Sequence, residues 1–215
     1  MEIFHQINII THVTAGLLSL MLGLWALIVV KGGPKHLLFG KYFTRLVAVV
    51  ILTGLIGVFV YHRNTFLLVI TLLSGYTCFS GIRAIRLRGH RPKFLDYLAP
   101  FLVTSSALYY LYYIRSIGMY WAPAVTYSTM FALFMVTLYD LFKVFMSQSF
   151  LIKAYLYEHV YKMVSAFIAL ASAFSGTVLP QYQPYSQLLP SVFGFIYIIA
   201  TFIRLSARPL TLKQN

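Results

Sequence analysis

The chain alternates between long apolar segments and short polar segments from its beginning to its end. The apolar segments run for roughly 18–25 residues, which is long enough to cross the hydrocarbon core of a bilayer as a helix. Lysine and arginine lie almost wholly between them or at their ends. This pattern predicts an all-α transmembrane bundle of seven helices that forms a single domain over residues 1–215. The predicted helices cover residues 8–30, 36–61, 65–85, 95–114, 120–145, 158–178 and 188–203.

The first two predicted helices carry the same short pattern, a histidine followed four residues later by a glycine. The pairs are His12 with Gly16 and His36 with Gly40. Residues four apart share one face of a helix, so we expect each glycine to leave space beside its histidine. The stretch from His12 to Gly40 holds both patterns and a basic turn, and we expect the other helices to pack around it. Residues 146–157 precede the sixth predicted helix, and the pattern leaves open whether they lie along the membrane interface.

Composition excludes the soluble classes of protein. Hydrophobic residues make up 60% of the chain and charged residues only 10%, too few to cover a soluble surface. The net charge of +13 would suit a nucleic-acid partner, but lysine and arginine lie between the apolar segments, so we expect no nucleic acid. Their uneven distribution predicts an N-terminus outside and a C-terminus in the cytoplasm. The basic stretch Arg83–Lys93 is expected to bind anionic lipid headgroups.

Four short motifs carry a resemblance to a known family: HVTAG, KGGPKHLLFG, SGYTCFSGIRAIRLRG and EHVYKMVSAFIALASAF. In this order they resemble a widespread bacterial family of multi-pass membrane proteins of unknown function. The resemblance implies a multi-pass fold in the bacterial cytoplasmic (inner) membrane, and no particular activity. Before the late histidine the family often has Trp-Leu-Arg, and this chain has Tyr155-Leu-Tyr-Glu158 instead. The resemblance therefore implies no role for a basic residue at this place in this chain. The family's characteristic positions correspond here to His12, His36, Gly40, Arg83, Arg86, His159, Met163 and Pro190.

The predicted topology sorts the histidines into two groups by depth. His12 and His62 are expected near the outer surface, and His36 and His159 near the inner surface. Neutral imidazole is a common metal ligand, and two histidines on facing helices suit a haem iron. We therefore predict two candidate sites for haem b or a transition metal, His12 with His62 and His36 with His159. Gly16 and Gly40 would leave room for a flat porphyrin. The alternative is that His12 makes an interhelical hydrogen bond while His36 and His159 lie at headgroup level.

Acidic residues are rare, and three of the four, Asp96, Asp140 and Glu158, lie near the inner ends of helices. Asp140 and Lys143 are three residues apart and are expected to pair on one helix face, close to Glu158 and Lys162. Ionisable side chains within a membrane often mark proton or ion pathways, so Asp140, Lys143 and Glu158 form a candidate gate. The alternative is a charge-paired rim at the cytoplasmic surface.

These patterns leave three classes of function open. The leading hypothesis is a redox-related membrane protein that binds haem or a metal through its histidines. The others are a small permease or channel, and a structural or assembly subunit of a membrane complex or homo-oligomer. The chain contains no Walker loop, nucleophile elbow, CxxC or HExxH motif, which argues against a conventional soluble-type enzyme.

Overall fold

The computed structural model describes residues 2–61, 66–117 and 123–207, and these are almost entirely helical. The predicted all-α class is confirmed, because the described residues contain no strand. The long helices are α1 (Glu2–Ile28), α2 (Pro34–Phe59), α3 (Phe66–Leu87), α4 (Phe94–Ile117), α5 (Pro123–Phe142), α6 (Gln148–Val178) and α7 (Tyr185–Ser206). Two short 3-10 helices, η1 (Lys143–Phe145) and η2 (Pro180–Tyr182), lie on either side of α6.

Of the seven long helices in the described residues, six are long and apolar enough to cross a membrane. The helix that does not meet this condition is α4. Asp96, Pro100 and a series of tyrosines lower the hydropathy of α4. The structure therefore describes a helical protein of the multi-pass membrane type. The described part of the chain has six candidate membrane spans, whereas the sequence predicted seven in the whole chain.

Two helices begin earlier than predicted. α1 starts at Glu2, and α6 starts at Gln148, ten residues before the predicted start of the sixth helix at 158. The hydroxyl of Ser147 accepts a hydrogen bond from the backbone N–H of Phe150 at 3.3 Å, which caps the α6 N-terminus. Residues 148–157 thus form the first turns of α6. The predicted fifth helix begins with residues 120–122, which lie outside the described residues.

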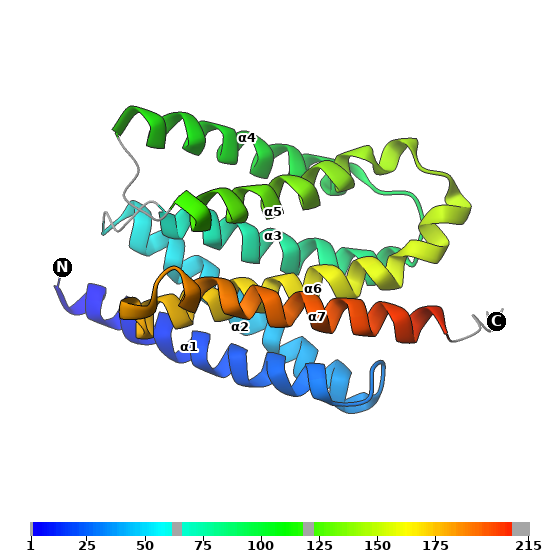
Figure 1. Ribbon diagram of the computed structural model, residues 1–215, viewed down its shortest axis with the longest axis horizontal. Helices are drawn as coiled ribbons and strands as arrows, with labels where there is room; N and C mark the ends of the chain where they lie inside the picture. Colours follow the sequence, from blue (N-terminus) through cyan, green and yellow to red (C-terminus); the bar gives the residue numbers. More distant parts are fainter. Residues whose placement is uncertain (1, 62–65, 118–122, 208–215) are drawn as a thin grey trace.

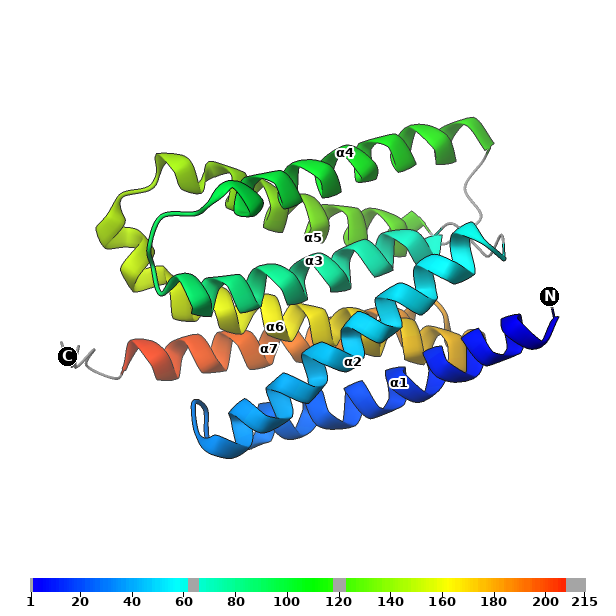
Figure 2. The ribbon, with the colours of Figure 1, turned by 180° about the vertical axis from the view of Figure 1, so that it is seen from behind.

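The helices run roughly along one long axis, so α1 begins at one end of the bundle and α7 ends at the other (Figure 1). α4 and α5 form one flank, α3 and α6 the middle, and α1, α2 and α7 the other side (Figures 1 and 2). The turns after α1, α3 and α5 lie at the same end of the bundle as the C-terminus of α7. We call it the basic end because Lys31, Lys35, Arg86 and Arg204 lie there.

α6 occupies the centre of the packing. Three clusters of buried hydrophobic residues fill the bundle, and α6 contributes Ala169 to the first, Ala166 to the second and Val164 to the third. α1 packs mainly on α2 and only lightly on α6. The expectation that the bundle packs around residues 12–40 is therefore wrong, because that hairpin lies at one side.

The predicted basic turn between α1 and α2 is present. Gly32 has φ +76°, a conformation that favours glycine, and Pro34 is the first residue of α2. The Lys31 ammonium donates to the carbonyl of Ala26 at 3.1 Å and so satisfies a backbone group left unpaired at the end of α1. This turn places His36 in the first turn of α2.

The α3–α4 connection is pressed against the start of α6. Gly89 has φ +82°, and a Cβ atom there would lie 2.5 Å from Cα of Ile152. The side-chain amide of Gln148 donates to the carbonyl of Gly89 at 2.7 Å. Only glycine fits both the backbone conformation and the close approach. This contact fixes the basic ends of α3 and α6 against each other.

Candidate functional site

His36 and His159 meet at the basic end of the bundle. His36 comes from the first turn of α2, and His159 from the twelfth residue of α6. Their ring centroids are 6.5 Å apart and the rings lie edge to face, at 80°. The structure thus brings together the two histidines predicted to form the inner site.

The hydrogen bonds of this pair define which nitrogen of each ring carries the proton. His36 Nδ1 lies 3.0 Å from the carbonyl oxygen of Ala26 on α1, and His159 Nδ1 lies 3.0 Å from the carbonyl oxygen of Gly81 on α3. A carbonyl oxygen only accepts hydrogen bonds, so Nδ1 is the donor in both rings. In the neutral imidazole Nε2 then keeps its lone pair. A backbone carbonyl on the other ring nitrogen is the usual arrangement around a metal-ligating histidine.

His12 lies towards the opposite end of the bundle, in α1. Its Nδ1 is 2.9 Å from the hydroxyl of Thr53 on α2. That hydroxyl also lies 2.8 Å from the carbonyl of Val49, which can only accept its proton, so His12 Nδ1 donates and Nε2 keeps its lone pair. The interhelical hydrogen bond considered for His12 is present. His62, its predicted partner, lies outside the described residues.

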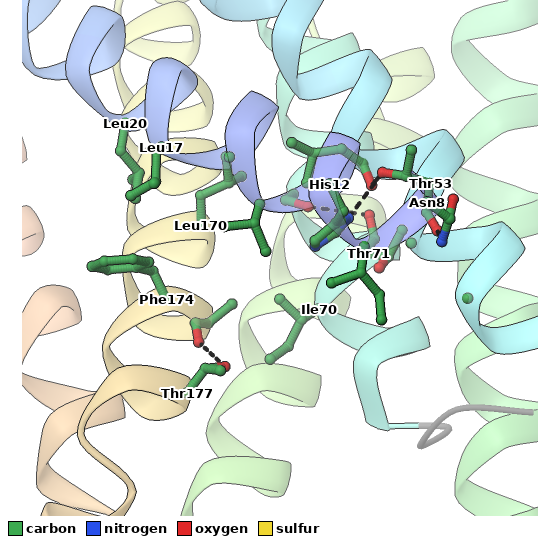
Figure 3. A pocket seen from close by; sticks show the side chains of 18 of the residues that line it. Asn8, His12, Leu17, Leu20, Thr53, Ile70, Thr71, Leu170, Phe174 and Thr177 are labelled. Atoms are coloured by element: carbon green, nitrogen blue, oxygen red, sulfur yellow. Dashed lines mark hydrogen bonds between the residues drawn. The ribbon is translucent and has the colours of Figure 1, made fainter. Parts of the chain in front are cut away.

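A cavity of about 420 Å³ lies beside His12, between α1, α2, α3 and α6 (Figure 3). Most of its lining is aliphatic or aromatic. Asn8 of α1, Thr53 of α2 and Thr71 of α3 lie around His12, and Thr177 of α6 lies apart from them. Gly16 lines this cavity, and a Cβ atom on Gly16 would meet nothing within 4 Å. Gly40 also has open space at its Cβ position, but it does not line this cavity.

A second group of polar side chains is buried between α3, α5, η1 and α6. The Lys162 ammonium donates to Asp140 Oδ1 at 2.6 Å, and Lys143 lies 2.9 Å from the same oxygen. Lys143 also pairs with Glu158 Oε2, to which Lys162 donates at 3.3 Å. The predicted Asp140–Lys143 pair is therefore one side of a closed network of two lysines and two carboxylates.

Two tyrosines complete the network. The Tyr76 hydroxyl donates to Asp140 Oδ2 at 2.6 Å, and the Tyr139 hydroxyl donates to Glu158 Oε1 at 2.9 Å. The four charged residues are only 1–8% exposed. The four charges are therefore paired with one another, as in the predicted charge-paired rim. They are buried, however, and do not form a rim exposed to solvent. Burying a charge is costly unless it is paired and hydrogen-bonded, and here both conditions are met.

The basic stretch beyond α3 divides into a paired and an unpaired part. Arg83 Nε donates to Asp96 Oδ1 at 2.6 Å, and its Nη2 donates to Asp96 Oδ2 at 2.7 Å, a bidentate pair that joins α3 to α4. Asp96 also accepts from the backbone N–H of Lys93 at 2.8 Å, which caps the α4 N-terminus. Arg86, Arg88, Arg91 and Lys93 are exposed.

Sequence reasoning missed several partners in these sites. It did not select Thr53 and Asn8 beside His12, nor Tyr76 and Tyr139 in the charged network. These residues reach the sites from other helices, and one sequence carries no signal for which helices are neighbours. Lys162 was expected at the inner side, close to Asp140, Lys143 and Glu158.

Within the described ranges, no three histidine, cysteine, aspartate or glutamate side chains converge as a metal site, so the His36–His159 pair has no third side chain of these types beside it. Searches with protein-family models, curated proteins and solved structures find no match to this chain. Function must therefore be argued from the sites themselves.

Proposed function

We propose that the protein is a redox-related membrane protein that ligates an iron of haem b, or a transition-metal ion, between His36 and His159. The observation that carries this proposal is the 6.5 Å spacing of two rings whose Nδ1 atoms both donate to backbone carbonyls. Those hydrogen bonds hold each ring in the tautomer in which Nε2 is a ligand.

The two rings would hold one metal ion or one haem iron through their Nε2 atoms, because each Nδ1 already donates to a backbone carbonyl. The pair supplies two protein ligands. A porphyrin supplies the four other nitrogens that a six-coordinate iron needs, so haem matches the ligand count better than a bare ion. When bound, haem would supply one-electron redox chemistry.

The proposed setting is the bacterial inner membrane, with the basic end of the bundle in the cytoplasm. The charge asymmetry supports this orientation. The exposed residues Arg86, Arg88, Arg91 and Lys93 are placed to bind anionic headgroups, at about 1 kcal/mol per charge. Arg83 is excluded from this role because it is bound to Asp96.

An absorption spectrum of the purified protein, oxidised and then reduced with dithionite, tests the proposal together with metal analysis of the same sample. We expect a reduced b-type band that is lost in His36→Ala and in His159→Ala. His90→Ala is the matched control, because His90 also directs Nδ1 at a backbone carbonyl, that of Leu87, but is exposed and unpaired with another ring. A colourless, metal-free protein expressed with ample haem and metal would overturn the proposal.

A second candidate function, proton or ion movement, is favoured by the buried charged network. Asp140, Lys143 and Glu158 share hydrogen-bonded neighbours that link α3, α5 and α6. Such chains of ionisable groups serve as proton relays in membranes. Proton flux into proteoliposomes, abolished by Asp140→Asn and unaffected by His90→Ala, would support this function. Flux equal to that of empty liposomes would exclude it.

A further inference from the structure

We propose that the cavity beside His12 binds a lipid-soluble quinol, with a hydroxyl of the quinol ring donating to His12 Nε2. This inference goes beyond the proposed function, because the cavity and the His36–His159 pair lie towards opposite ends of the bundle and share no residue. The binding does not require a metal at the pair.

The cavity has the polarity of a site for an amphipathic ring. Its polar pole is formed by His12 with Asn8, Thr53 and Thr71, and most of the remaining wall is aliphatic or aromatic, with Thr177 as a separate polar group. Thr53 holds the His12 ring through Nδ1, which leaves Nε2 as a fixed hydrogen-bond acceptor. Asn8 is held as well, because its amide nitrogen donates to the carbonyl of Thr53 at 3.1 Å. A ligand that carries a hydroxyl therefore meets a pre-oriented partner.

The shape of the cavity favours a flat ring over a simple chain. Glycines stand on both sides of His12: Gly16 on α1, and Gly54 and Gly57 on α2. The Gly16 side of the cavity is open, since no atom lies within 4 Å of its Cβ position. This open side leaves room for a planar group beside the imidazole, whereas the Gly54 side is closed by Thr71, whose Oγ1 would lie 3.3 Å from a Cβ atom there. A volume of about 420 Å³ lies in the range of small-molecule sites.

The cavity is reached from the apolar surface of the bundle. Leu17 from α1 and Phe174 from α6 stand on two sides of it (Figure 3), and both are exposed. α1 packs closely on α2 but only lightly on α6, so the seam between α1 and α6 opens to the surface that we assign to lipid. His12 is ten residues from Glu2, or roughly 15 Å along α1 at 1.5 Å per residue, a depth that lipid-soluble rings reach.

The test is a calorimetric titration of the full chain in detergent with decylubiquinol. We expect saturable binding to the wild-type protein. Gly16→Leu, which fills open space without a clash, should weaken it at least tenfold, as should His12→Phe, which removes the acceptor. Gly40→Leu is the matched control, because it adds the same side chain at an open position that does not line the cavity. His36→Asn should also bind decylubiquinol normally, which separates this inference from the proposed metal site.

Four results would overturn the assignment. The first is no wild-type binding at all, and the second is wild-type binding that Gly16→Leu leaves unchanged. The third is equal affinity for dodecanol, which has a hydroxyl and a chain but no ring, and which would make the cavity a general lipid site. The fourth is a haem band lost in His12→Phe and retained in Gly40→Leu, which would assign the cavity to a porphyrin.

Discussion

His36 and His159 have ring centroids 6.5 Å apart and ring planes at 80° to each other. Each ring donates through Nδ1 to a backbone carbonyl of another helix. His36 binds the last turn of α1, and His159 binds α3. Nδ1 therefore has a packing role in both rings, and Nε2 of the neutral ring is left for the proposed ligation. Substitutions that mimic one nitrogen at a time separate these two roles.

The first prediction concerns His36→Asn. The asparagine amide places an N–H close to the position of Nδ1, so the hydrogen bond to Ala26 and the stability of the fold should be retained. It provides no nitrogen at the position of Nε2, so the proposed haem band should be lost. Thermal unfolding in detergent and the reduced spectrum check the two parts. A variant that unfolds as easily as His36→Ala, yet keeps its band, would contradict this division of roles.

The second prediction concerns the buried charged network. Lys162→Met leaves two carboxylates facing a single lysine, and removing one partner of a buried ion pair costs about 3–5 kcal/mol. The double variant Lys162→Met, Asp140→Asn leaves Lys143 with Glu158, so it should be more stable than the single variant. Lys153→Met, at an exposed position on the same helix, is the control and should change the unfolding midpoint little. Additive losses in the double variant would show that the network is not coupled.

The third prediction concerns Gly89. Gly89→Ala places a Cβ atom 2.5 Å from Cα of Ile152 and forces an L-residue to φ +82°, so it should destabilise the protein by about 1–3 kcal/mol or more. Gly40→Ala meets no atom within 4 Å and should stabilise α2 by up to about 1 kcal/mol, from helix propensity. Unfolding midpoints of both variants, measured in the same detergent, make the comparison. Similar midpoints for the two would show that α6 moves away from residue 89 without cost.

The fourth prediction concerns orientation. Cys78 is the chain's single cysteine and is buried, so an introduced cysteine reports its own position. Ser149→Cys lies at the basic end and Gln181→Cys at the other end, and both positions are exposed. A membrane-impermeant maleimide should label Gln181→Cys on intact cells, and Ser149→Cys only after the cells are permeabilised. The reverse pattern would place the basic end outside.

The helices themselves followed from the sequence because segment length and apolar content decide whether a segment is a helix in a membrane. The start of α6 was placed too late because Lys153, the tyrosines around it and Glu158 make residues 148–157 look like a polar connection. In the structure Lys153 is exposed, while Glu158 is buried against Lys143. Hydropathy along the chain does not distinguish a charge in solvent from one with a buried partner.

The sequence predicts which site residues lie at the same depth in the membrane, but not which helices are neighbours. His36 and His159 were paired because both were expected at the inner ends of helices, and the structure places them together. The cavity beside His12 depends on which helices surround α1, which is a property of side-chain packing across the bundle. For the same reason the central place of α6 could not be foreseen, since its small residues Ala166 and Ala169 resemble the small residues of α1.

The central place of α6 has a consequence for how the protein is made. Helices leave the ribosome in chain order, so the segment that carries His159, Glu158 and Lys162 enters the membrane after the five helices before it. Until then His36 has no partner ring, and Asp140 and Lys143 lack half of their network. Assembly of the pair and of the network is therefore a late step of biogenesis, possible only when translation has passed α6, and a chain that stops at α5 would hold Asp140 and Lys143 without Glu158 and Lys162.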